Sequence, residues 1–485
     1  MYINHVVSHL TPNSILNNRQ MILNTVKWLL AFADESTYDN VPVIDDPSPF
    51  MTCVYLSSIL TSHYQVPLHM NVLELESVQN GNFNRTVNYL HIVQRSVECF
   101  IRIAAQEERF SPREYVNLSQ AFRNATDVDI HSYVFFLTAI MSSSFPSGSI
   151  ESILWTNRMV YNIDDYVRHL EIPLIEVQLL FQMLTISMDE FRETSLSSLS
   201  SRWDFNYFRY RPLIRLGNLF YPLDSQFILE NLWDVLYWRI HDGLDTEAAA
   251  KFRVFFGRVF ELYCNDLLEQ ASPNLVRAKY IREFEYTYER NRLMSPDAFI
   301  DYGSDLLAID YKTKRLKMQA TLVEGNLDSL EQDLLQMIIE PARKIHAHLK
   351  KFISRPIAGV PIDFTCVKRV HGIIVTQGSF SGVKSLYEKI EEKLRIEGLY
   401  DLTIRIDWHI LDVNEFEAMV SLIEQNINLA NTFVQKASSR YRHISFHDYL
   451  AYARRPHRHS EIAKQRFSEW LDYVVSVMSR NQVEE

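Results

Sequence analysis

Two short apolar runs joined by a glycine-containing turn, between residues 295 and 313, constrain the fold more than any other segment. Runs of this length around such a turn predict a β-hairpin. Side chains alternate between the two faces of a strand, so Asp310 and Lys312 project from one face of the second run. The hairpin also brings Asp297, at the start of the first run, beside Asp310. Two carboxylates this close suit Mg²⁺ or Mn²⁺, which take oxygen ligands.

The segments on both sides of the hairpin predict an α/β core. Residues 251–270 carry apolar side chains at helical spacing, and Glu261 lies on this helix one turn after Gly257, where another backbone can approach closely. Residues 282–289 alternate and predict a strand. The elements expected downstream are a helix at 327–352 broken near Pro341, a strand at 372–376, a helix at 383–397, a strand at 402–410 and a helix that begins at Asp412 with Glu415 in a capping box. The expected fold class is a mixed sheet flanked by helices.

These residues resemble the PD-(D/E)XK nuclease superfamily of restriction enzymes, recombination nucleases and resolvases, over about residues 250–412. The residues that carry the resemblance follow the family's αβββαβ order: Glu261 on the leading helix, Pro296-Asp297 on the second strand and Asp310-Tyr311-Lys312 on the third. Some branches of the family carry Gln-x-x-x-Tyr on the next helix. This chain matches it only at Gln332, because Gln336 stands in place of the tyrosine, so the resemblance implies Gln332 as a further candidate catalytic residue.

The resemblance implies a nuclease that hydrolyses DNA with Mg²⁺ or Mn²⁺ as cofactor. Asp297, Asp310 and the backbone carbonyl of Tyr311 would hold one ion, and Glu261 would contribute directly, through water or to a second ion. The ion lowers the pKa of a bound water and neutralises charge on the phosphate. Lys312 would orient the attacking water or help to deprotonate it. By family analogy alone, the chain resembles standalone nuclease effectors of bacterial defence or restriction systems.

Three other interpretations stay open. An ordinary ion pair between Asp310 and Lys312 on a solvated strand face gives the same pattern, because an acid two residues before a lysine recurs by chance. A non-catalytic nucleic-acid-binding or scaffold subunit that keeps the fold for assembly would show the same order of elements. RNA is an alternative substrate, since carboxylates and lysine act on phosphate and not on the sugar.

The rest of the chain predicts two further regions around a nuclease-like domain at 250–428. Residues 1–245 are mostly helical by apolar periodicity, as at 174–188, for recognition or partner binding, with a hairpin at 211–222. Asp224 then caps a helix that contains Trp233, Tyr237 and Trp238, and such an aromatic helix is more often core than a stacking platform. Residues 429–485 form a basic helical segment. Within it, 436–466 carries eight lysines and arginines against two acids, interleaved with Tyr441, Phe446, Tyr449 and Tyr452. This composition suits base stacking with phosphate contacts, and equally a helical tail whose aromatics pack in the core.

Composition constrains the class of protein and its partners less tightly than the motifs do. Of the 485 residues, 47% are hydrophobic, which is typical of a globular protein, and the net charge of −11 makes DNA binding depend on local basic surfaces such as 312–317. Four scattered cysteines and no visible signal peptide predict a cytoplasmic protein. Two long uncharged stretches, 47–73 and 130–150, contain polar residues throughout and predict buried helices, not membrane spans.

Other motifs are weaker. The glycines at 378 and 382 have the wrong spacing for a phosphate-binding loop, so an ATP-driven motor or a sensor would be a separate partner subunit. His443 and His447, and His457 and His459, lack a set of carboxylate or cysteine partners for metal. A homodimer is also open, because cutting both strands from one active site per chain favours two copies.

Overall fold

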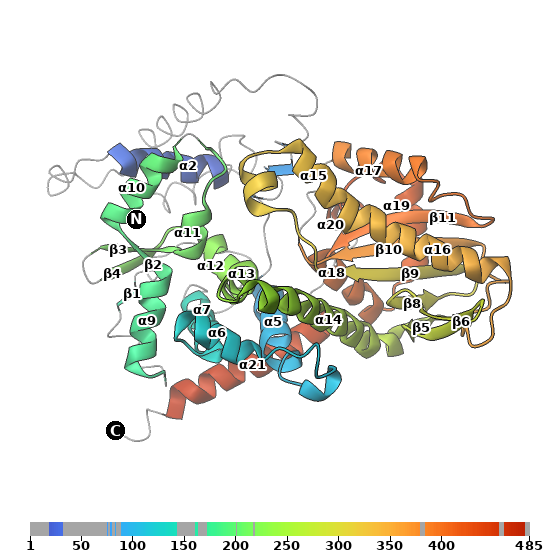
Figure 1. Cartoon of the computed structure of the whole chain (residues 1–485), viewed down its shortest axis with the longest axis horizontal. Helices are drawn as coiled ribbons and strands as arrows, with labels where there is room; N and C mark the ends of the chain where they lie inside the picture. Colours follow the sequence, from blue (N-terminus) through green and yellow to red (C-terminus); the bar gives the residue numbers. More distant parts are fainter. Residues whose placement is uncertain are drawn as a thin grey trace. The chain divides into compact units, whose positions relative to one another are not determined.

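The computed structural model describes residues 19–32, 75, 78–79, 83, 89–142, 161–162, 172–199, 201–216, 219–378, 384–454 and 460–480. The chain forms two compact units, and Figure 1 gives their elements. The first unit includes Phe83–Phe252 and Phe467–Glu485, and the second includes Leu68–Asn82 and Arg253–Arg466.

The first unit is mainly helical, as the sequence predicts for residues 1–245. Its elements are α2 (Arg19–Phe32), α5 (Tyr89–Ser96), the π-helix η3 (Val97–Ile103), η4 (Glu107–Arg109), α6 (Leu118–Thr126), α7 (Ile130–Ser142), α9 (Leu174–Leu184), α10 (Met188–Ser198), α11 (Asn206–Tyr210), α12 (Ser225–Leu232), α13 (Asp234–Asp242) and most of α21 (Glu461–Arg480). A small sheet runs in the order β1 (Tyr161–Asn162), β4 (Leu219–Pro222), β3 (Leu213–Leu216), β2 (Thr185–Ser187). The predicted hairpin is confirmed by the antiparallel pairing of β3 with β4, while its turn residues 217–218 lie outside the described part of the chain.

Two predicted helices of this unit are shorter than expected. The helix predicted at 174–188 ends at Leu184, because the β-branched Thr185 and Ile186 pair with Leu213 and Ile214 in the small sheet. The helix that Asp224 caps also ends early, at Leu232, and Trp233 separates it from α13. Trp233 and Tyr237 are buried, so these two aromatic side chains belong to the core, and Trp238 is half-buried.

The second unit contains the expected mixed sheet flanked by helices. The sheet runs in the order β11 (Arg405–Asp412), β10 (Arg369–Thr376), β9 (Asp305–Lys312), β8 (Ala298–Asp301), β5 (Lys279–Arg282). The strands β9, β10 and β11 are parallel, whereas β8 is antiparallel to both of its neighbours. The helices and turns of the unit are α14 (Thr246–Ala271, shared with the first unit), η6 (Ser272–Asn274), η7 (Met318–Val323), α15 (Leu327–Leu334), η8 (Leu335–Ile339), α16 (Glu340–Ser354), α17 (Lys384–Ile396), α18 (Val413–Glu424), α19 (Leu429–Ser438) and α20 (Phe446–Tyr452).

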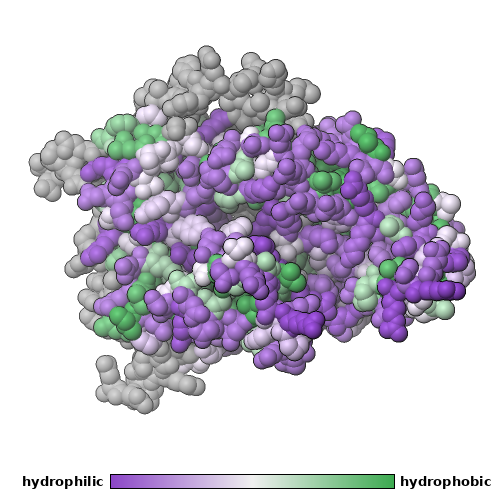
Figure 2. All heavy atoms as spheres, viewed as in Figure 1, coloured by the Kyte–Doolittle hydropathy of each residue, from purple (hydrophilic) through white to green (hydrophobic). Residues whose placement is uncertain are grey.

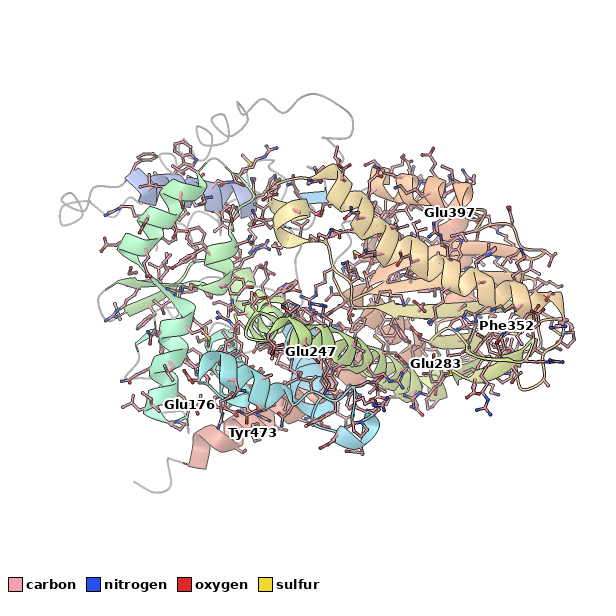
Figure 3. All side chains as sticks on the ribbon, in the orientation of Figure 1. Glu176, Glu247, Glu283, Phe352, Glu397 and Tyr473 are labelled. Atoms are coloured by element: carbon pink, nitrogen blue, oxygen red, sulfur yellow. The ribbon has the colours of Figure 1, made fainter. Side chains whose placement is uncertain are left out.

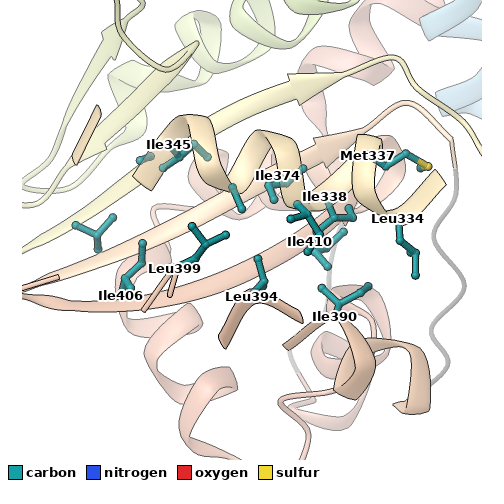
Figure 4. Packing of buried hydrophobic residues seen from close by; sticks show 14 of the residues in the cluster. Leu334, Met337, Ile338, Ile345, Ile374, Ile390, Leu394, Leu399, Ile406 and Ile410 are labelled. Atoms are coloured by element: carbon teal, nitrogen blue, oxygen red, sulfur yellow. The ribbon is translucent and has the colours of Figure 1, made fainter. Parts of the chain in front are cut away.

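Helices cover both faces of this sheet. One face carries Ala308, Ile374 and Ile410, which pack with α15, α16 and α17 in a single apolar core (Figure 4). On the other face, the Tyr311 ring meets Phe416 of α18 edge to face. Burial of this apolar surface stabilises the layered arrangement.

One strand prediction is wrong. The run 282–289 divides into β5, which ends at Arg282 and pairs with β8, and β6 (Glu285–Tyr288), which pairs with β7 (Asn291–Met294) in a separate hairpin. Glu289 and Arg290 make the hairpin turn with positive φ angles of 49° and 67°. This pair of angles is the type of turn that matches the twist of two adjoining strands, so the segment folds back instead of continuing.

Other predictions for this unit are confirmed. The predicted helix at 327–352 is helical but interrupted by the π-helical η8, which directly precedes Glu340 and Pro341 at the start of α16. Asp412 caps α18 and forms the expected capping box with Glu415. The strand expected at 402–410 lies at 405–412.

The predicted C-terminal segment 429–485 is divided between the units, with α19 and α20 in the second and most of α21 in the first. Of the two long uncharged stretches, 130–150 begins with the buried helix α7, and 47–73 lies outside the described residues. No helix among the described residues combines the length and apolar composition needed to cross a membrane. The face shown in Figure 2 is mostly hydrophilic, with scattered hydrophobic side chains.

Candidate active site

The hairpin of β8 and β9 places Asp297 beside Asp310, as the sequence predicts. Ala298 pairs with Ile309, so Asp297, one residue before β8, stands opposite Asp310 near the carboxyl end of β9. The Tyr311 backbone N–H donates to Asp297 Oδ2 at 2.7 Å and fixes this carboxylate against the neighbouring strand. The Asp310 side chain is fully buried and Asp297 is 6% exposed. Two acidic groups are therefore held together in a largely dry position.

Two lysines neutralise this pair. Lys312 Nζ lies 2.5 Å from Asp310 Oδ2, as expected for side chains two residues apart on one face of a strand. Lys344, from α16, places its Nζ 2.9 Å from Asp310 Oδ1 and 3.3 Å from Asp297 Oδ1. Lys344 is absent from the residues predicted from sequence, yet it is the one that contacts both carboxylates.

The environment shifts the proton affinity of these groups. Burial, and after it the negative charge of Asp310, raise the pKa of Asp297 to about 7, although the Lys344 ammonium and the Tyr311 N–H act in the opposite direction. Burial lowers the pKa of Lys344, but the charges and hydrogen bonds of Asp310 and Asp297 outweigh burial and raise it above its ordinary value. The negative charge of Asp310 contributes to both shifts, because it disfavours a second negative charge on Asp297 and favours the ammonium group of Lys344.

A third carboxylate extends the same row across the sheet. Arg282 pairs with Ala298, so the next residue, Glu283, stands opposite Asp297, and its N–H donates to the Asp297 carbonyl at 3.0 Å. Glu283 is labelled in Figure 3. Burial raises the pKa of Glu283, and the charge of Glu261 raises it further. Sequence reasoning missed Glu283 because it treated 282–289 as one continuous strand.

Arg258 links Glu261 of α14 to the row of carboxylates. Arg258, one turn earlier on the helix, forms an ion pair with Glu261 and lies 4.0 Å from Glu283 Oε2. A methyl group added at Gly257 would lie 3.6 Å from the Thr313 hydroxyl, so α14 passes close to the chain that leaves β9. The close approach predicted at Gly257 involves a side chain and not a backbone.

Gln332 lies in a different environment. It is exposed on α15, and its Oε1 accepts a hydrogen bond from Lys317 Nζ at 3.1 Å. Its neighbour Asp333 is buried and accepts from the Lys317 N–H and the Thr321 hydroxyl, both at 2.8 Å. The structure therefore places Gln332 with Lys317 in a local network, and it places Lys344 with the carboxylate pair.

The carboxylate pair fits a divalent ion of the Mg²⁺ type. Among the described residues, no three histidine, cysteine, aspartate or glutamate side chains gather as a set of metal ligands. Mg²⁺ does not require such a set, because it keeps several waters and binds through one or two carboxylates together with substrate phosphates. The Oδ1 atoms of Asp297 and Asp310 already face one shared cationic nitrogen. The pair therefore offers two oxygen donors that face one position.

The basic C-terminal segment divides between core and surface. Phe446 and Tyr449 are buried, so these two aromatic side chains pack in the core and are not exposed for base stacking. Tyr441 and Tyr452 instead stack with their ring centroids 4.8 Å apart and an interplanar angle of 7°, and Tyr452 is 63% exposed. The Arg440 guanidinium lies 4.8 Å from the centre of the Tyr441 ring. One exposed aromatic stack with a cation beside it therefore remains as a candidate contact for nucleic acid.

The weaker motifs carry no site in the described residues. His443 Nε2 lies at hydrogen-bond distance, 2.5 Å, from Glu391 Oε2 of α17. His457 and His459 lie outside the described part of the chain, and so do residues 379–383 of the glycine-containing loop. In the basic run 312–317, Lys317 bonds to Gln332, and Arg315 packs against Gly378.

Comparison with protein-family models, with curated proteins and with solved structures gives no match. The geometry of the carboxylate pair and its surroundings is therefore what bears on function.

Proposed function

We propose that this chain is a metal-dependent nuclease that hydrolyses DNA phosphodiester bonds with Mg²⁺ or Mn²⁺. One observation carries the proposal: two buried carboxylates, Asp297 and Asp310, converge near the end of β9, with Lys312 Nζ 2.5 Å from the second. The order α14, β5, β8, β9, α15 to α16, β10 supports the resemblance to the PD-(D/E)XK superfamily, with β6 and β7 as an inserted hairpin.

Each residue of the site would have a separate role in hydrolysis. Asp297 and Asp310 would hold the ion, and the Tyr311 backbone would fix Asp297 and offer its carbonyl. When bound, the ion supplies an acidified water and neutralises charge on the phosphate. The Lys312 side chain is 30% exposed at the rim, so its ammonium can reach a phosphate oxygen or the attacking water. Glu261 and Glu283 would orient water on the side facing α14.

The exposed tyrosine stack supports nucleic acid as the substrate class. Bases stack on exposed aromatic side chains, and arginines contact the backbone. Tyr452 offers such a ring, and Arg440, Arg442 and Arg454 are exposed in the same segment. A net charge of −11 makes a local basic surface of this kind necessary for binding a polyanion.

A second candidate is a non-catalytic nucleic-acid-binding or scaffold subunit with the same fold. Lys344 favours it, because one ammonium group already neutralises both carboxylates at 2.9 and 3.3 Å. An acidic pair that is satisfied in this way can serve as a structural ion-pair network.

Cleavage assays separate the two candidates. Plasmid, linear duplex, single-stranded DNA and RNA are incubated with Mg²⁺, Mn²⁺ or EDTA and the native chain, Asp310→Asn or Lys312→Met. Asp305→Asn is the matched control, because Asp305 begins the same strand at its opposite end. Metal-dependent cutting that disappears in the first two variants and persists in the control supports the nuclease and identifies its substrate. Binding without cutting under every metal condition, with the variants indistinguishable from the native chain, would favour the scaffold.

A further inference from the structure

A single ammonium group occupies the position between the two carboxylates. Lys344 Nζ contacts Asp310 Oδ1 at 2.9 Å and Asp297 Oδ1 at 3.3 Å, from a helix on one face of the sheet. Lys312 behaves differently, because its ion pair with Asp310 uses Oδ2, and it extends from the strand itself. Of the two lysines, only Lys344 stands where both acidic side chains would share a cation.

This position cannot hold Lys344 and a divalent ion together at full occupancy. Each of the two distances is shorter than 4 Å, and Asp310 is fully buried, so charges interact strongly here. A divalent ion on the same two Oδ1 atoms would meet a like charge at contact distance. Binding of the ion therefore favours withdrawal of the ammonium group.

The side chain of Lys344 can withdraw without disturbing the fold. It is 38% exposed, so part of its flexible stem already lies in solvent. The helix itself is anchored by Ala342 and Ile345, both fully buried in the apolar core. The movement is thus confined to the lysine side chain, and the released ammonium group stays at the rim of the site.

We propose that Lys344 is an exchangeable counter-ion, which holds the two carboxylates in the metal-free protein and is displaced by the divalent ion. The displaced ammonium group becomes available to a phosphate of the substrate, so ion binding and nucleic-acid binding support each other. This inference rests on the proposed function, since it requires a divalent ion at the same two carboxylates.

Mn²⁺ binding to the full chain tests the exchange. Free Mn²⁺ is measured by electron paramagnetic resonance for the native chain, Lys344→Met and Lys350→Met, the last being an exposed lysine of the same helix with the same loss of charge. The expected result is a Kd for Mn²⁺ that is lower by about tenfold or more in Lys344→Met, because the competing charge is gone. Lys350→Met should bind as the native chain does.

Thermal unfolding gives a second measurement and guards against a misfolded variant. In EDTA the Tm of Lys344→Met should be lower than that of the native chain, because its carboxylates repel each other, and Mn²⁺ should raise the Tm of the variant more than that of the native chain. The double variant Asp297→Asn/Lys344→Met removes one charge of each sign. In EDTA its Tm should therefore be close to that of the native chain, but it should not bind Mn²⁺ as tightly as Lys344→Met does.

The outcomes separate the inference from the proposed function. Tighter Mn²⁺ binding by Lys344→Met supports the exchange, whether or not the native chain binds detectably. Equal or weaker binding by the variant, with the native chain binding Mn²⁺, overturns the exchange and leaves the nuclease intact. Failure of both to bind millimolar Mn²⁺ overturns the two together.

Discussion

The two buried histidines of the sheet should make the second unit sensitive to acid. His371 of β10 and His409 of β11 are joined by a hydrogen bond between Nδ1 and Nε2, 3.1 Å apart, and Phe433 of α19 packs on both rings. Such a bond needs one ring nitrogen as donor and the other as acceptor. A proton added to the acceptor removes that bond and places a charge in the core.

The size of the effect follows from the pKa of His371. Burial is the largest cause that lowers this pKa from 6.5 to about 4; Asp407 and Asp305 act to raise it, and Arg369 and Arg405 act to lower it. The folded pKa lies below the unfolded one, so the unfolded state binds more protons between these values and stability is lost as the pH falls through that window. At about pH 5 this amounts to roughly 2 kcal/mol for one histidine.

His409 acts in the same direction. Burial lowers its pKa well below the ordinary value, and the charges of His371 and Lys436 lower it further. The native chain should therefore lose at least about 2 kcal/mol of unfolding free energy between about pH 7.5 and about pH 5 through this pair.

The comparison is with His371→Phe/His409→Phe. This variant replaces both hydrogen-bond partners by apolar rings of similar shape, so its unfolding free energy at high pH should be close to that of the native chain. Urea titrations read by hydrogen-exchange mass spectrometry report the unfolding of β10 and β11 separately from the rest of the chain. Subtracting the variant's pH dependence from that of the native chain removes the contribution of surface carboxylates. If the variant loses as much stability on acidification as the native chain, the histidines do not hold the lowered pKa values and the reasoning fails.

Three further predictions concern packing, binding and capping. Gly372→Ala should cost about 1–3 kcal/mol of unfolding free energy, because the new methyl group would lie 2.4 Å from two ring carbons of Trp408, and adding Trp408→Leu should recover part of the loss in the same urea titration. Tyr452→Ala should weaken binding of single-stranded DNA by about 1–3 kcal/mol in fluorescence anisotropy while Tyr452→Phe binds normally, and equal binding by all three chains would remove the tyrosine stack from the interface. Asp412→Ala should lower the unfolding free energy by about 1 kcal/mol, because Asp412 Oδ1 accepts from the N–H groups of Asn414 and Glu415 at the start of α18, and an unchanged urea midpoint would contradict that role.

Local patterns made much of the second unit predictable. The alternation of side chains placed Asp310 and Lys312 on one face, and the glycine-containing turn set the register that brings Asp297 opposite Asp310. Both inferences depend on residues close together in the chain. The break after Arg282 was not predictable in this way. Residues 279–282 pair with β8, whereas residues 285–288 pair with β7, and the pattern of side chains does not show where one pairing ends and the other begins.

Lys344 shows why part of the site could not be found in the sequence. The helix α16 carries several basic residues, and Lys344 and Lys350 have the same chemistry and both lie outside its buried stripe. Helical periodicity separates the buried positions of α16 from the rest, but it does not show which exposed position faces a carboxylate. That depends on where α16 crosses the sheet, which the packing of Ala342 and Ile345 in the core decides. The signal that could have found Lys344 is a charge imbalance: two buried aspartates need more positive charge than Lys312 supplies, so a second cation had to come from the covering helix.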